Sequence, residues 1–173
     1  GDASKLKTEA FMRRFGKFIQ SLGGKYYTAE DVNMKTSDME YIAMETKYVT
    51  GLPESMGGGG DPSPVTAYGV YIGMKAGAKK AFGSDSLAGK KIGVQGVGQV
   101  GAHLVELLAK EKAIVSITDI SQEKLAIVSA AHGAKPVSQN EFYDLDMDIY
   151  APCALGATLN DETIPRLKCA LIA

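Results

Sequence analysis

Three glycines in the second half of the chain have the types and spacing needed to bind a phosphate group. Gly96, Gly98 and Gly101 follow the apolar run Ile92–Gln95 and open a helical pattern. A GxGxxG spacing alone is weak evidence, but the preceding strand and following helix are the context of a dinucleotide-binding turn. The first glycine permits the turn, the second lets the backbone approach a pyrophosphate, and the third lets the helix pack closely. The predicted cofactor-binding residues of this turn are Gly96, Val97, Gly98, Gln99, Val100 and Gly101.

An acidic residue lies where such a turn requires one. Asp119 ends the apolar run that follows the predicted helix, roughly 20 positions after the glycines. Its carboxylate can accept hydrogen bonds from ribose hydroxyls and would repel a 2′-phosphate, and no arginine follows it closely. The sequence therefore favours NAD over NADP as cofactor. The alternative is a solvated aspartate that caps the helix beginning near Ser121.

Short strands and helices alternate through the second half of the chain. The predicted strands are Lys91–Gln95, Ala113–Thr118, Met147–Tyr150 and Cys169–Ala173, and the predicted helices between the first three are Gly98–Lys110 and Ser121–Ala131. Such alternation produces parallel sheets with crossover helices. The predicted fold class is therefore α/β, with a Rossmann-type parallel sheet.

The first half is richer in helical patterns. Apolar residues at helical spacing predict a helix over residues 5–22, which Gly23 and Gly24 end. A β-prone run at residues 25–28 and a second helix after Thr36 or Ser37 follow. Beyond a glycine-rich loop, Ser63 and Pro64 predict the start of a helix that runs to about Phe82. Because that helix is apolar or small nearly all round, it is expected to be buried between layers.

Composition narrows the classes of function. The 173 residues carry a net charge of −1 without a basic tract, which gives no indication of nucleic-acid binding. No apolar run is long enough to predict a membrane span, and no signal-peptide pattern is present. Cys153, Cys169, His103 and His132 form no metal-ligand pattern. The two cysteines are interpreted as reduced thiols of a cytoplasmic protein.

Four segments together resemble one family of amino acid dehydrogenases. They are YYTAEDVN (26–33), GDPSPVTAYGVYIGMKA (60–76), GVQGVGQVG (93–101) and DIYAPCALGATLND (148–161). In this order they are similar to the leucine, phenylalanine and valine dehydrogenases of the glutamate/leucine/phenylalanine/valine family, and to the leucine-type members most of all. The resemblance covers essentially the entire chain, and its most specific parts are TAEDV, PSPVTAYGV and YAPCALGA.

The resemblance implies an activity and roles for individual residues. The expected reaction is NAD-dependent oxidative deamination of a branched-chain L-amino acid, leucine, to the 2-oxo acid, ammonia and NADH. Asp31 matches the catalytic aspartate. The other matched positions are cofactor contacts: Thr66 near the nicotinamide carboxamide, Asp119 and Ile120 at the adenosine ribose, and Cys153 and Ala154 through their backbone. No chemistry is expected of the Cys153 side chain.

The resemblance also implies an organisation. Residues 1–60 match the end of an α/β substrate and oligomerisation domain, 61–83 a connecting helix, and 84–173 an NAD-binding domain. The family's catalytic lysine segment and its terminal helices find no match. The chain is therefore expected to be an internal fragment, inactive by itself, of an enzyme that acts on a small molecule and forms a homo-oligomer.

Two alternative functions remain open. One is another oxidoreductase of the same fold, such as a phenylalanine-, valine- or glutamate-type dehydrogenase. The other is a non-catalytic module that senses a dinucleotide. Such modules usually begin near their glycine turn, whereas 90 residues of patterned sequence precede Lys91 here, which disfavours that interpretation.

Overall fold

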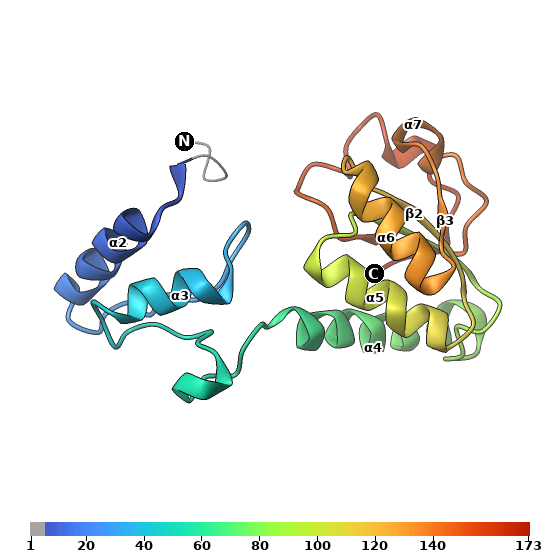
Figure 1. The fold of residues 1–173 in the computed structure, drawn as a ribbon. Helices are drawn as coiled ribbons and strands as arrows, with labels where there is room; N and C mark the ends of the chain where they lie inside the picture. The colour runs from blue at the N-terminus through green and yellow to red at the C-terminus, as the bar shows by residue number, and fades with distance from the viewer. Residues whose placement is uncertain (1–5) are drawn as a thin grey trace. The chain divides into compact units, whose positions relative to one another are not determined.

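The computed structural model describes residues 6–173 and divides at Pro62 and Ser63 into two compact units (Figure 1). The first unit contains helices α2 (Glu9–Ser21) and α3 (Thr36–Ala43) and the short 3-10 helix η1 (Glu54–Met56). Helix α2 begins later than the expected residue 5, because the Thr8 hydroxyl accepts a hydrogen bond from the Phe11 N–H and caps the helix there. Lys5 lies outside the described residues.

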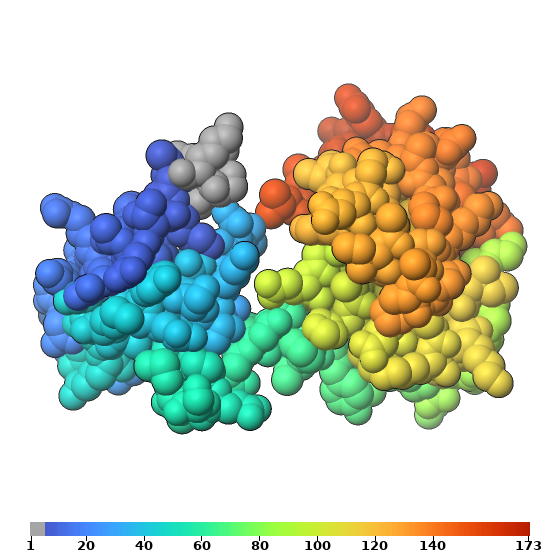
Figure 2. All heavy atoms as spheres, viewed as in Figure 1, coloured from blue at the N-terminus to red at the C-terminus, as the bar shows by residue number. Residues whose placement is uncertain are grey.

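The core of the first unit lies between its two long helices. Met12 of α2 packs with Met39 and Ile42 of α3. The helices approach closely at Gly16, where an added Cβ would lie 2.7 Å from the carbonyl oxygen of Ile42. Figure 2 shows the α2 and α3 atoms, in blue and cyan, as one packed body. The β-prone run before α3 forms only a single parallel bridge, between Thr28 and Val49, rather than a strand.

The second unit is built on a parallel sheet of five strands. The order is β3-β2-β1-β4-β5, with bounds β1 (Lys91–Gln95), β2 (Ile114–Thr118), β3 (Lys135–Pro136), β4 (Ile149–Pro152) and β5 (Leu171–Ile172). The predicted α/β class with a Rossmann-type sheet is confirmed. Strand β3 was not predicted, because two residues that include a proline carry no period-two pattern.

Helices cover both faces of this sheet. Helices α4 (Ser63–Phe82), α5 (Gln99–Lys110) and α6 (Gln122–His132) share one buried core with the strands. Figure 1 shows α4 and α5 side by side beneath α6. The opposite face carries the short helix α7 (Gln139–Phe142), where Phe142 packs with Met147 and Tyr150. An added Cβ on Gly93 would lie 2.6 Å from the Met147 sulfur, so β1 needs a glycine on this face.

Helix α4 differs from the expectation that it would be buried all round. Ala67, Met74 and Ala78 face the core and are fully buried. Val65, Tyr68 and Ile72 remain 76%, 54% and 44% exposed. The helix therefore covers one side of the second unit instead of lying between two layers. Within residues 6–173 no helix is both long and apolar enough to span a bilayer.

A carboxylate fastens α4 to the end of α5. Glu111 accepts hydrogen bonds from Lys75 Nζ at 2.7 Å, from the Leu87 N–H at 2.9 Å and from the Tyr71 hydroxyl. Burial acts to raise the pKa of Glu111, but the hydrogen bonds from Lys75, Tyr71 and Leu87 outweigh it and the pKa is lowered. The ionised carboxylate thus holds together three segments that are distant in sequence.

Candidate functional site

The three glycines of the turn between β1 and α5 differ in whether the fold itself requires a glycine at that position. Gly96 has φ +90°, and its Cβ would lie 2.7 Å from the Ala154 nitrogen. A Cβ on Gly101 would lie 1.9 Å from the carbonyl oxygen of Gly96. A Cβ on Gly98 would meet nothing within 4 Å, and its φ of −67° suits any residue. The fold itself therefore needs the first and third glycines, whereas the second leaves an open approach to the backbone.

Helix α5 begins at this open approach. Gly98 is its N-cap residue and provides no side-chain hydrogen bond to the first turn. An α-helix cannot satisfy its first N–H groups internally, and its N-terminus carries a partial positive charge. The N–H groups of Gln99, Val100 and Gly101 therefore form a start of α5 suited to an anion. The combination of an open glycine and a helix start fits a pyrophosphate.

Asp119 holds the turn from the neighbouring strand. Its Oδ2 accepts a hydrogen bond from the Val97 N–H, and its Oδ1 accepts one from the Ser121 N–H, both at 2.8 Å. Each carboxylate oxygen has a second lone pair, which leaves capacity for ribose hydroxyls. Ile120 beside it is 86% exposed. Ser121 rather than Asp119 caps α6, since the Ser121 hydroxyl accepts the Lys124 N–H.

The structure also locates two other predicted cofactor contacts, Val97 and Thr66. Val97 is 2% exposed and its N–H is donated to Asp119, so it serves the turn itself. Thr66 lies in the first turn of α4, and Ser63 at the start of that helix donates a hydrogen bond to the Gln99 side chain at 3.0 Å. This contact brings the beginning of α4 to the beginning of α5.

The loop after β4 lies against the glycine turn. The Cys153 N–H donates to the Gln95 carbonyl at 2.8 Å, and the carbonyl carbon of Cys153 would lie 2.8 Å from a Cβ on Gly96. Burial raises the pKa of the Cys153 thiol to about 11, so the thiol stays protonated at neutral pH. The structure thus brings Cys153 and Ala154 to the turn through their backbone.

A buried polar network that the sequence analysis missed supports the same edge of the sheet. The Tyr150 hydroxyl donates to Gln95 Oε1, and Gln95 Nε2 donates to the Tyr143 hydroxyl at 2.8 Å. Tyr150 is fully buried, and its ring packs against Phe142 and Tyr143. The signal in the sequence was a glutamine and a tyrosine inside otherwise apolar strands, because a buried polar side chain needs a partner.

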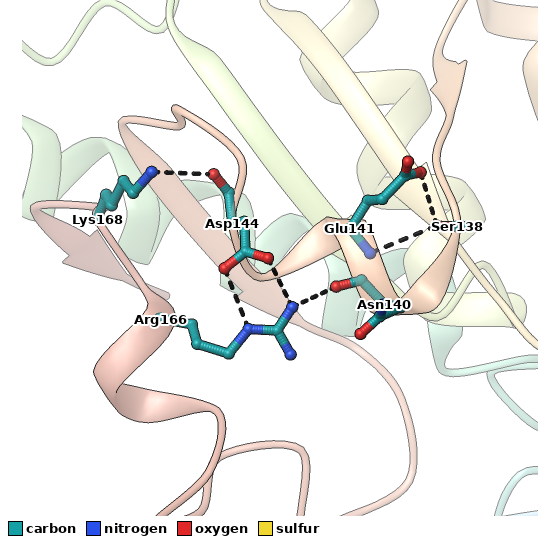
Figure 3. Close-up of polar contacts among 6 residues, drawn as sticks. All are labelled: Ser138, Asn140, Glu141, Asp144, Arg166 and Lys168. Atoms are coloured by element: carbon teal, nitrogen blue, oxygen red, sulfur yellow. Dashed lines mark hydrogen bonds and ion pairs between the residues drawn. The ribbon is translucent and has the colours of Figure 1, made fainter.

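The chain beyond this loop is fastened back to α7 (Figure 3). Arg166, in the 3-10 helix η2 (Ile164–Arg166), donates to both carboxylate oxygens of Asp144, from Nε at 3.1 Å and from Nη2 at 2.7 Å. The Arg166 hydrogen bonds lower the pKa of Asp144. Lys168 Nζ also donates to the Asp144 carbonyl, at 3.3 Å. These contacts attach the end of the segment that begins at Cys153 to the residues that follow α7.

Asp31, the predicted catalytic residue, belongs to the first unit, whereas the other predicted site residues belong to the second. It is exposed and lies just before a turn. Its Oδ1 accepts the Val32 N–H at 2.7 Å, and its carbonyl accepts the Met34 N–H at 3.0 Å. Asn33, within this turn, adopts a positive φ of 61°.

Comparison with known proteins identifies the family. The chain is 54% identical over all of its residues to leucine dehydrogenase from Geobacillus stearothermophilus, of which it spans 47%. A family model described as Glutamate/Leucine/Phenylalanine/Valine dehydrogenase matches residues 57–122. The chain belongs to this dehydrogenase family. The matched range includes the start of α4, the glycine turn and Asp119.

Solved structures agree with this family assignment. L-tryptophan dehydrogenase from Nostoc punctiforme aligns with a TM-score of 0.72 and 39% identity, over 97% of this chain and 47% of that one. The hetero-hexameric glutamate dehydrogenase from Thermus thermophilus aligns with a TM-score of 0.74 over 95% of this chain and 45% of that one. Its identity is 22%, so it supports the fold alone. The chain spans about half the length of the dehydrogenases that it matches.

Proposed function

We propose that the chain carries the NAD site and one catalytic residue of an NAD-dependent leucine dehydrogenase. The reaction would convert a branched-chain L-amino acid to its 2-oxo acid, ammonia and NADH. The observation that carries the proposal is the contrast among the three glycines. The fold requires Gly96 and Gly101, whereas Gly98 leaves open space at the start of α5 that suits a bound pyrophosphate.

In this proposal the residues around the turn contact different parts of the cofactor. The N–H groups at the start of α5 would bind the pyrophosphate, and Asp119 would accept the ribose hydroxyls beside the exposed Ile120. The negative charge of Asp119 opposes a 2′-phosphate, which favours NAD over NADP. The backbone of Cys153 and Ala154 would line the site, and Thr66, in the first turn of α4, would contact the nicotinamide carboxamide.

Asp31 would act as a general acid and base. NAD, when bound, supplies the acceptor for the hydride that leaves the amino acid α-carbon. The resulting imine is hydrolysed by water, and this step needs a group that takes a proton from the water and returns one to the departing amine. A carboxylate on an exposed turn, as Asp31 is, can do both at its free oxygen. In this proposal residues up to 60 belong to the substrate and oligomerisation domain and residues 84–173 to the NAD-binding domain, with the helix between as the connection.

Leucine is the proposed substrate because 54% identity to a leucine dehydrogenase exceeds the 39% identity to the tryptophan enzyme. Activity on valine, phenylalanine or glutamate is the alternative. We also propose a cytoplasmic homo-oligomer. The oligomer is the organisation implied by the resemblance of residues 1–60 to an oligomerisation domain, and a reducing compartment suits the two free thiols, Cys153 and Cys169.

Production of NADH is the measurement that tests this proposal. The chain is joined to the flanking segments of the Geobacillus stearothermophilus enzyme and assayed at 340 nm with leucine, valine, phenylalanine and glutamate. We expect the highest kcat/KM with leucine. The Asp31→Asn variant should lower kcat by roughly 10²–10⁴, the usual effect of losing an acid–base group, without weakening NAD binding.

The exposed Glu54 provides a matched control in the same unit. Glu54→Gln removes one negative charge, as Asp31→Asn does, and should leave kcat unchanged. Preference for another amino acid would overturn the substrate assignment alone. NAD binding without turnover of any amino acid would instead support the dinucleotide-sensing alternative.

A further inference from the structure

Lys7 makes two short polar contacts beside the turn that carries Asp31. Its Nζ donates to the carbonyl oxygen of Asn33 at 2.6 Å and to Asp38 Oδ2 at 2.6 Å. The two charged side chains are only 15% and 9% exposed. Because both side chains are largely buried, solvent screens the attraction between them less than it screens a surface ion pair.

The start of α3 completes a bracket around this turn. Asp38 Oδ2 also accepts the Lys35 N–H at 2.8 Å, which fixes the end of the turn. The Thr36 hydroxyl donates to Glu30 Oε1 at 2.7 Å, which fixes its beginning. Hydrogen bonds therefore fix the chain on both sides of residues 31–34, and Lys7 binds the turn itself through the Asn33 carbonyl.

Asn33 is the residue of this turn with a left-handed backbone. Its φ of 61° lies in a region that favours glycine and that asparagine enters more readily than most other residues. The ammonium group of Lys7 binds the carbonyl oxygen that this conformation presents. Because the Met34 N–H donates to the Asp31 carbonyl, the conformation of Asn33 also sets the direction of Asp31.

We propose that Lys7 is a positioning residue for Asp31, an inference that rests on the catalytic role proposed for that aspartate. Lys7 touches no reacting atom and acts through the Asn33 carbonyl and Asp38. Lysine suits this place because its compact ammonium can donate to two acceptors in different directions, whereas the planar fork of arginine favours one carboxylate. A catalytic group displaced by about 1 Å can lose on the order of 10² in rate.

A double-mutant cycle in the joined full-length enzyme tests this role. Lys7→Met should lower kcat for leucine by about 10-fold to 100-fold while the Kd for NAD stays the same. In the Asp31→Asn background the same substitution should change kcat little, because no aspartate remains to be positioned. Lys7→Arg, which keeps the charge, should recover only part of the activity. Lys25→Met is the control, because Lys25 is an exposed lysine of the same unit, and it should have no effect.

The outcomes separate the two proposals. An equal loss of kcat in both backgrounds, or no loss in either, would overturn the positioning role of Lys7. Unchanged kcat in Asp31→Asn alone would instead overturn the catalytic role of the aspartate. If Lys7→Met does not fold by circular dichroism, Lys7→Gln retains a donor and carries the same cycle.

Discussion

The two units hold their proposed site residues by different means. In the second unit the glycine turn is held by backbone, because Gly96 and Gly101 lie against main-chain atoms of the same turn and of the loop after β4. In the first unit the turn with Asp31 is held by side chains, those of Lys7, Thr36 and Asp38. A backbone-built site tolerates almost no change of residue, whereas a side-chain bracket can be weakened in steps.

Substitutions of the glycines test the first half of this comparison and should have the largest effects. Gly98→Val should abolish detectable NAD binding by the chain, because its side chain fills the open approach to α5, and circular dichroism should stay unchanged. Gly96→Ala should lower both NAD binding and the melting temperature, because φ is +90° and the Cβ would clash with Ala154. Calorimetric titration and thermal melts measure the two effects. Undiminished NAD binding by Gly98→Val would show that the turn does not bind phosphate.

Asp119 combines the two kinds of support, because its side chain accepts hydrogen bonds from the backbone of the glycine turn. Replacing Asp119 with Ser and Ile120 with Arg should shift the cofactor preference from NAD toward NADP, because a 2′-phosphate would meet a positive charge. The absolute affinity should also fall, because the Val97 and Ser121 N–H groups lose their acceptor. Titrations with both cofactors measure the ratio, and equal affinity of the unmodified chain for both would contradict the proposed role.

Glu111 is the side-chain anchor of the second unit and should respond to pH. Its pKa is lowered in the folded chain, so its contribution to stability is present above the ordinary value of about 4.5 and is lost as pH falls further. Glu111→Gln should reduce the free energy of unfolding by about 1–3 kcal/mol at neutral pH. Below pH 4.5 the difference should shrink. Urea unfolding across this range measures it, with the exposed Glu162→Gln as control, and a difference independent of pH would argue against an ionised anchor.

Cys153 should show the smallest effect, although it lies at the proposed site. Its thiol is protonated at neutral pH, since burial raises the pKa to about 11, and the residue lies against the glycine turn with its backbone and its Cβ. Cys153→Ala should leave NAD affinity unchanged, and thiol reagents should modify it slowly. Rapid modification at neutral pH would reveal a thiolate and would reopen the question of a chemical role for the side chain.

Sequence alone determined the features that depend on neighbours along the chain. The strand Lys91–Gln95, the helix that follows the glycine turn and the end of α2 at Gly23 are confirmed, because chirality and local periodicity fix them. The tertiary structure decided what depends on contacts across the chain. It decided the partial exposure of α4. It also decided the Lys7 contacts, the Glu111 anchor and the Gln95 network, which join residues 24 to 55 positions apart, and no local pattern records such pairs.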